Sequence, residues 1–187
     1  GAMALAIPMR EPKLDSLRLA VPGLRLLRIS LEWDAGRENV LDERLGVAAL
    51  PLVDEKLPGR SHVVFGNQPT SPEQSTRLGA SNGVVEIDLD AVPADVGRVA
   101  VIVFIHPRPG AARRSLSQLR SLRAVVTDAE KGTPITRSVD LAKSAGNVTA
   151  LIAVEVYRRG SEWKVKVNGQ GFDGGLDAGL AQFGLPA

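Results

Sequence analysis

The sequence predicts an all-β protein, a sandwich of two packed antiparallel sheets with a few short helices. The first observation is alternation: across residues 27–33, apolar side chains alternate with Arg28, Ser30 and Glu32. This period of two is typical of a strand with one buried face and one wet face. The second observation is a series of short apolar segments separated by turns rich in Gly and Pro. Many short strands joined by such turns favour a sandwich.

The N-terminal half contains four expected strands. They cover residues 27–33, 47–53, 63–65 and 84–89. Pro51 has no backbone N–H to donate, so we expect the second of these strands at a sheet edge or at a bulge. Residues 66–81 are rich in Pro, Ser, Thr and Gln, and they predict a loop.

The C-terminal half begins with the most apolar segment of the chain. Residues 99–105 are apolar on both faces, which indicates a central strand. Ser115 is placed to cap a short helix that starts at Leu116. The other expected elements are a strand at 124–126, a turn at 128–133, a hairpin of 148–156 with 162–167, and an amphipathic helix at 176–183.

Composition limits the class of protein. The chain has 187 residues, of which 44% are hydrophobic and 24% charged, as is ordinary for a globular domain with a substantial core. We interpret residues 1–3 as the remnant of a cleaved tag, and we expect a single domain at residues 17–187 after an N-terminal segment, 1–16. The absence of cysteine excludes disulfides, thiolate metal sites and cysteine nucleophiles, and it fits a cytoplasmic location. No apolar run approaches the roughly 20 residues that cross a bilayer.

The positive charge is unevenly distributed, although the formal net charge is only +2. No acidic residue lies between Asp95 and Asp128. Arginine binds phosphate and carboxylate through a planar fork, so this window is a candidate for binding an anion or a partner. A solvated basic surface is the alternative interpretation. The candidate residues are Arg108, Arg113, Arg114, Arg120 and Arg123.

The sequence contains no motif of a known catalytic centre. His62 and His106 are the only histidines, and neither lies in a nucleophile motif, so we interpret both as polar residues at strand ends. The glycine string at 169–175 lacks the Lys-Ser/Thr of a phosphate-binding P-loop, and its glycines suit positive φ or close packing. Trp33 and Trp163 are interpreted as buried core. We therefore expect a protein that is not an enzyme.

Five segments together resemble a known family. Residues 157–172 read YRRGSEWKVKVNGQGF and are followed by a Gly-Gly-Leu string. Upstream lie VPGL at 21–24, ISLEWD at 29–34, DLDAVPADV at 88–96 and VIVFIH at 101–106. In this order and spacing, over residues 17–185, they resemble the TerD family of bacterial tellurium-resistance and stress proteins. The resemblance implies a β-sandwich, a role in stress response, and other stress or Ter-type proteins as partners.

The resemblance also implies calcium binding by clustered aspartates, and this chain departs from that pattern. Arg44 and Gly46 stand where the family has two aspartates, and residues 77–83, the counterpart of an acidic Gly-Asp loop, contain no carboxylate. Because calcium takes 6–8 oxygen ligands, we expect its binding to be lost or weakened, and we expect no other cofactor. The remaining candidates for a rebuilt metal site are Asp34, Glu38, Asp42 and Glu43. The alternative is a surface loop in which Arg37 and Arg44 pair with these carboxylates.

Three functions therefore remain open. The first is a non-catalytic stress-response or tellurium-resistance domain that acts through binding or scaffolding. The second is a basic module that binds phosphate, nucleic acid or an anionic membrane through its arginine-rich segment. The third is a calcium sensor with a rebuilt acidic-loop site.

Overall fold

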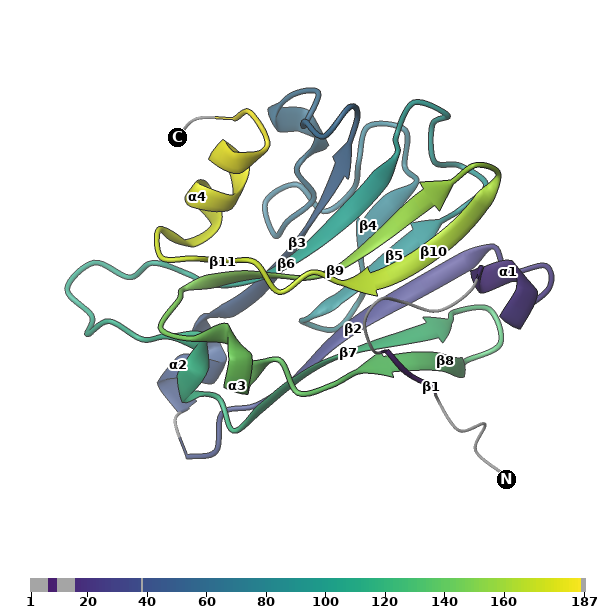
Figure 1. Ribbon diagram of the computed structural model, residues 1–187. Helices are drawn as coiled ribbons and strands as arrows, with labels where there is room; N and C mark the ends of the chain where they lie inside the picture. The colour runs from purple at the N-terminus through teal and green to yellow at the C-terminus, as the bar shows by residue number, and fades with distance from the viewer. Residues whose placement is uncertain (1–6, 10–15, 38, 186–187) are drawn as a thin grey trace.

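The computed structural model describes residues 7–9, 16–37 and 39–185, which form a sandwich of two sheets (Figure 1). Sheet A contains, in spatial order, β1 (Ile7–Met9), β8 (Thr133–Ser138), β7 (Ser121–Asp128), β2 (Leu26–Asp34), β5 (Val84–Asp88) and β4 (Thr76–Leu78). Sheet B contains β10 (Glu162–Val167), β9 (Ala150–Arg159), β6 (Arg98–Ile105) and β3 (Leu45–Leu52), and the short β11 (Gly171–Phe172) also pairs with β9. Neighbouring strands are antiparallel, except that β1 lies parallel to β8. The predicted fold class is confirmed.

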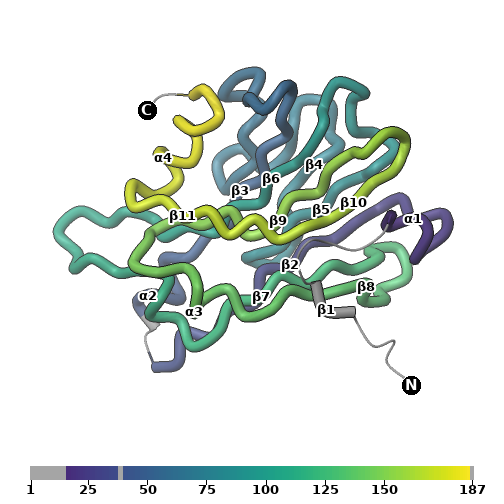
Figure 2. Tube along the Cα trace, viewed as in Figure 1, coloured from purple at the N-terminus to yellow at the C-terminus, as the bar shows by residue number. Residues whose placement is uncertain are grey.

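Short helices lie at the ends and on one face of the sandwich. They are α1 (Leu17–Ala20), α2 (Asn39–Arg44), α3 (Ala142–Ala145) and α4 (Gly175–Gln182), with 3₁₀ turns η1 (Arg60–His62) and η2 (Leu116–Gln118). In the tube view, α2 and α3 lie at the same end of the molecule as the long loop after β6 (Figure 2). No helix in the described part of the chain is long and apolar enough to cross a membrane.

The main core lies between the two sheets, and a second core lies on the outer face of sheet B. Between the sheets, the period-two positions of β2, such as Leu27 and Ile29, are fully buried. On the outer face, Ile102 of β6 packs with Leu180 and Phe183, which come from α4 and the turn after it. Strand β6 is therefore covered on both sides, which explains why its sequence is apolar throughout.

The hairpin and its glycine-rich exit follow the sequence prediction. Strand β9 continues to Arg159, and the turn uses Gly160 at φ 64° before β10 begins. Gly169 adopts φ 86°, where a side chain would be strained. A Cβ on Gly171 would lie 2.8 Å from Val148 Cγ1, so that glycine permits close packing. Both predicted reasons for glycine in this string are confirmed.

Several elements differ from the sequence predictions. Val64 and Phe65 make only isolated bridges, not a strand, and β4 lies inside the segment predicted as a loop. Strand β8 is a further difference: its first residue, Thr133, belongs to the predicted turn at 128–133, and its Pro134 lies opposite Thr127, where the β7–β8 register shifts. Helices α1, α2 and α3 are also absent from the sequence predictions. Trp163 is buried as predicted, but Trp33 is only partly buried, because its indole N–H reaches out to a carboxylate.

Candidate anion-binding site

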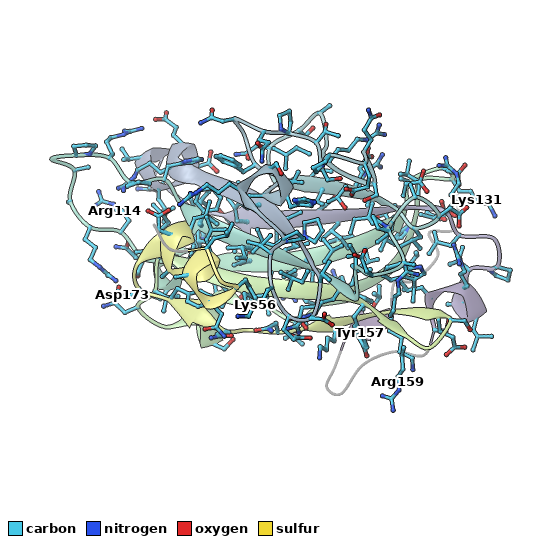
Figure 3. The ribbon with its side chains drawn as sticks, turned by 90° about the horizontal axis from the view of Figure 1, so that it is seen from above. Lys56, Arg114, Lys131, Tyr157, Arg159 and Asp173 are labelled. Carbon is cyan, nitrogen blue, oxygen red and sulfur yellow. The ribbon has the colours of Figure 1, made fainter. Side chains whose placement is uncertain are left out.

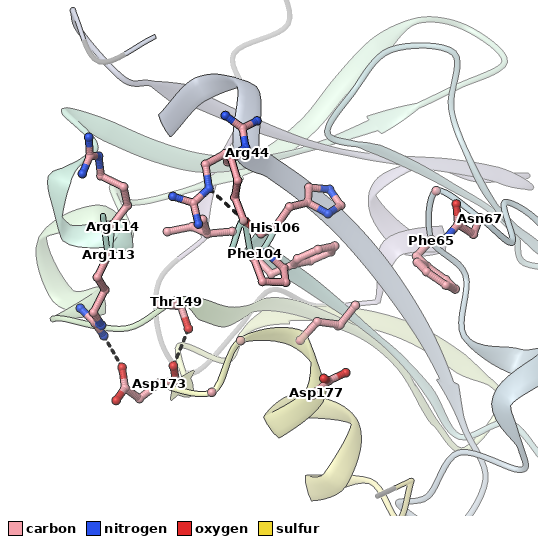
Figure 4. Close-up of a pocket in the computed structure, with 17 residues that line it drawn as sticks. Arg44, Phe65, Asn67, Phe104, His106, Arg113, Arg114, Thr149, Asp173 and Asp177 are labelled. Atoms are coloured by element: carbon pink, nitrogen blue, oxygen red, sulfur yellow. Dashed lines mark hydrogen bonds and ion pairs between the residues drawn. The ribbon is translucent and has the colours of Figure 1, made fainter. Parts of the chain in front are cut away.

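A cavity of about 570 Å³ opens at one end of sheet B (Figure 4). It lies where β6 passes into the loop at 106–115, beside the start of α4. In the close-up, Arg113 and Arg114 lie on one side of the cavity, and Phe65 and Asn67 lie on the other. The residues that line it are Arg44, 65–67, 104–108, Arg113, Arg114, Thr149 and 173–177.

Arg44, the last residue of α2, is the most buried cation of the cavity, at 7% exposure. Its Nε donates to the His106 carbonyl oxygen at 3.0 Å, and Nη1 donates to the Ala112 carbonyl oxygen at 3.3 Å. In return, its own carbonyl oxygen accepts the His106 N–H at 2.7 Å. Within the described residues Arg44 forms no ion pair, since both side-chain partners are neutral carbonyls. The guanidinium is therefore held in place by neutral oxygens, and no carboxylate among the described residues compensates its positive charge.

Arg113 is positioned differently, through a network of polar groups. Its Nη1 donates to Asn147 Oδ1 at 2.7 Å, its Nη2 donates to the Asn147 carbonyl oxygen at 2.8 Å, and it forms an ion pair with Asp173. Thr149 Oγ1 donates to the carbonyl oxygen of Asp173 at 2.7 Å. These contacts join the loop after β6 to the segment that precedes α4 and fix two walls of the cavity relative to each other.

Among the described residues that line the cavity, positive charges outnumber negative ones. Four arginines line it, namely Arg44, Arg108, Arg113 and Arg114, against Asp173 and Asp177. With His106 neutral, the formal charge of the lining side chains is four minus two, or +2. The positive charges share the cavity with apolar groups, namely the rings of Phe65 and Phe104 and the side chain of Leu176. Low-dielectric walls of this kind strengthen the attraction between a cationic site and an anion.

His106 forms part of the wall between Arg44 and the apolar groups. Its ring packs edge-to-face on Phe104, with ring centroids 4.8 Å apart. A Cβ on Gly46 of β3 would lie 2.6 Å from His106 Nε2 and 3.1 Å from Phe104 Cζ, so glycine leaves room for both rings. Desolvation by the surrounding walls, and secondly the positive charge of Arg44, lower the pKa of His106 below its ordinary value. The ring is therefore neutral at pH 7.

The structure divides the predicted arginine patch. Arg108, Arg113 and Arg114 meet at the cavity, whereas Arg120 and Arg123 do not line it. Arg120 packs on the turn at Gly36, with its Nε 4.0 Å from Asp34 Oδ2. Arg123 lies on β7 opposite Glu32 and donates to the Ser138 carbonyl oxygen at 3.3 Å. The window without acidic residues is thus not one continuous basic surface. From above, Arg114 and Asp173 lie at the end of the molecule far from Lys131 (Figure 3).

Arg44 and His106 were not among the anion-site residues that the sequence predicts. The one sequence feature that could have indicated Arg44 is its position, where the resembled family has an aspartate. What the sequence could not supply was the contact between Arg44 and the loop more than sixty residues later. The alternative interpretation paired Arg44 with carboxylates of the acidic loop. Among the described residues its guanidinium instead donates to the His106 and Ala112 carbonyls.

The acidic candidates do not form a calcium cage among the described residues. Asp34 Oδ1 accepts the Gly36 N–H at 2.7 Å, and Asp42 Oδ1 accepts the Trp33 indole N–H at 2.7 Å. Glu43 is exposed, and Glu38 lies outside the described residues. Nowhere in 7–9, 16–37 and 39–185 do three or more His, Asp or Glu side chains group to hold a metal ion. The described members of this set alone therefore do not supply the several carboxylate and carbonyl oxygens that calcium needs.

Comparison with known proteins assigns the fold to a family. A family model described as the TerD domain matches residues 6–183. The chain belongs to the TerD family. The tellurium resistance protein TerD of Serratia marcescens is 33% identical over 182 residues, which cover 92% of this chain and 94% of that protein. General stress protein 16U of Bacillus subtilis (strain 168) is 27% identical over 175 residues, or 88% of this chain and 90% of that protein.

A solved structure supports the same fold. The crystal structure of a homologue of the telluride resistance protein TerD from Streptomyces coelicolor A3(2) superposes with a TM-score of 0.59 at 20% identity. The match covers 81% of this chain and 92% of that one. This TerD chain is thus a β-sandwich domain of the tellurium-resistance and stress type, and the resemblance stated from its motifs is confirmed.

Proposed function

We propose that this TerD domain acts without catalysis, by binding an anionic ligand in the arginine-lined cavity as part of a tellurium-resistance or general stress response. We propose that it works in the cytoplasm beside other Ter-type or stress proteins. The observation that carries the proposal is Arg44, a buried guanidinium fixed by two carbonyls and paired with no described carboxylate. A buried charge is costly unless it is paired, so a ligand that supplies negative charge there stabilises the folded protein.

The geometry favours this function over a calcium sensor. Where the family pattern has carboxylates, this chain has Arg44 and Gly46, and Asp34 and Asp42 are engaged by a turn and by an indole. An arginine repels a cation and attracts an anion by the same Coulomb interaction. The charge preference of this end of the sandwich is therefore opposite to that of a calcium site.

A survival assay tests the proposed function. A bacterium that lacks its own TerD relative is supplied with this chain and challenged with tellurite. We expect the wild type to restore survival and Arg44→Ala with Arg108→Ala to restore much less. Arg123→Ala is the matched control, since this arginine lies in the same acid-free window but outside the cavity, and it should behave as wild type.

Two results would contradict the proposal. The first is equal survival with the wild type and with the cavity variant, which would show that the domain does not act through these arginines. The second is consumption of tellurite by the purified protein with a stoichiometry above one, which would mean that the domain is catalytic. Variant abundance in cell extracts must match the wild type, because loss of folding alone lowers abundance.

A further inference from the structure

We infer that the cavity takes a small organic phosphate, with the phosphate group at Arg44 and Arg108 and an aromatic or aliphatic body against Phe65, Phe104 and Leu176. This inference rests on the proposed function and names the ligand class of that site. Three properties of the cavity carry it: its volume, its division into a cationic side and an apolar side, and the two aspartates at its mouth.

The volume excludes a bare oxyanion as the best occupant. Cavities that hold organic ligands measure about 300–1,000 Å³, and this one measures about 570 Å³. A tetrahedral oxyanion is only a few times larger than a water molecule, so it would leave most of the cavity filled with solvent. A ligand with a body as well as an anionic group fills both parts.

The lining is divided in a way that suits such a ligand. Arg44 is anchored by its Nε and Nη1, a geometry that holds the planar guanidinium fork in one orientation. Because Nε and one N–H of Nη1 donate to these carbonyls, the part of the fork that meets a phosphate or carboxylate is Nη2 with the second N–H of Nη1. Beside it lie the Phe104 and His106 rings in an edge-to-face pair, and Leu176 and Phe65 complete the apolar side. Aromatic rings of a ligand gain from offset or edge-to-face packing on such groups.

The acidic residues limit how much negative charge the site accepts. Asp173 is 76% exposed at the cavity and pairs with Arg113, and Asp177 lies in the first turn of α4. A polymer with a phosphate on every unit, or a membrane surface, would bring further negative charges against these two carboxylates. Arg120 and Arg123 do not line the cavity, so they do not offset those further charges there. A single phosphate on a compact body brings fewer negative charges near these two carboxylates than such a polymer or surface does.

The binding experiment uses titration calorimetry on the purified chain with four probes: phenyl phosphate, inorganic phosphate, phenol and a 20-nucleotide single-stranded DNA. We expect phenyl phosphate to bind at least tenfold more tightly than inorganic phosphate, and phenol not to bind measurably. Phe65→Ala should remove most of the advantage of phenyl phosphate while leaving the affinity for inorganic phosphate unchanged. The partly buried position of Phe65 makes this substitution tolerable for the fold.

Charge variants test the anionic end of the site. Arg108→Glu should lower the affinity for both phosphates at least tenfold. The Arg108 side chain is exposed, so the fold persists without it. Asp173→Asn removes the carboxylate that pairs with Arg113 and should raise the affinity for both phosphates severalfold. Arg123→Ala should change neither. Arg44→Ala should also lower the affinity for both phosphates. A thermal melt establishes that this variant is folded.

The outcomes separate this inference from the function on which it rests. Equal affinity for the two phosphates, unaffected by Phe65→Ala, would overturn the organic ligand and leave an anion-binding domain. No binding of either phosphate would overturn both. Binding of the DNA that weakens in Arg123→Ala would assign recognition to the whole basic window and overturn the cavity as the site.

Discussion

The buried carboxylate of Glu155 provides a quantitative test of how sheet B is held together. Glu155 lies on β9 with its side chain only 1% exposed. It accepts from Arg98 Nη1 at 2.8 Å and from Asn168 Nδ2 at 3.0 Å, and Lys166 Nζ lies 3.5 Å away. Replacing it with alanine leaves two cations close together in a partly buried environment, so the variant should be substantially less stable.

The magnitude follows from the exposure of the partners. Removing one member of a buried ion pair costs about 3–5 kcal/mol. Arg98 and Lys166 are 21% and 39% exposed, and Arg98 keeps a second partner in Glu55, so both cations are partly stabilised in the variant. We therefore expect Glu155→Ala to lower the free energy of unfolding by about 3 kcal/mol, at the lower end of that range. In a domain of this size that corresponds to a decrease in Tm of about 6–12 °C.

Urea denaturation and thermal melts followed by circular dichroism measure this loss. Glu155→Gln keeps the shape of the side chain and one acceptor oxygen, so its free energy of unfolding should fall by about half as much as that of Glu155→Ala. The matched control is Asp90→Ala, which breaks the exposed pair with Arg18 at 2.7 Å and should cost less than about 1 kcal/mol. A loss below about 1 kcal/mol for Glu155→Ala would refute the reasoning, because the buried network would then contribute no more than a surface pair.

Three further predictions concern the cavity and the hairpin. Gly46→Ala should destabilise the protein by about 1–3 kcal/mol through overpacking, because the new methyl group would overlap His106. Adding His106→Ala should recover part of this loss, as measured by urea denaturation in a double-mutant cycle. The lowered pKa of His106 means that protonation favours the unfolded chain, so this contribution to stability is present above about pH 6.5 and is lost as the pH falls through the lower pKa of the folded state. Melts in buffers from pH 7.5 to 5 should show that loss in the wild type and less of it in His106→Gln. Arg158 donates to three carbonyls of the loop before β6 and stacks 4.2 Å from the Trp163 ring centroid, so Arg158→Lys should cost about 2 kcal/mol in urea denaturation, whereas Arg159→Lys, at an exposed position, should be neutral.

The strands could be predicted from the sequence because buried and exposed residues alternate along them, or because every residue is buried. Leu27 and Ile29 alternate with Arg28 and Ser30, and the structure buries the first pair. Residues 99–105 are apolar at every position, and β6 is covered on both faces. Local chemistry also predicted the turn after β9 and the cap at η2, where Gln118 Oε1 accepts the Ser115 N–H at 2.9 Å.

The cavity could not be predicted because its walls come from segments far apart in the chain. Arg44 ends α2, His106 follows β6, and Asp173 precedes α4. Only the packing of sheet B and the carbonyls that orient Arg44 bring them together. The arginine patch was predicted as one surface from its lack of acidic neighbours, whereas the strand register of β7 places Arg123 opposite Glu32. Charge along the sequence is a weak guide to charge in space.

A paired titration tests most directly the central claim, that this end of the domain binds an anion and not calcium. Chelator-treated protein is titrated with calcium and, separately, with phenyl phosphate, each with a thermal melt. We expect heat and a rise in Tm with phenyl phosphate, and neither with calcium below millimolar concentration. A ligand at 100 times its Kd should add about 2.7 kcal/mol of stability. Micromolar calcium binding that is lost in Asp34→Asn with Asp42→Asn, together with no response to phenyl phosphate, would contradict it.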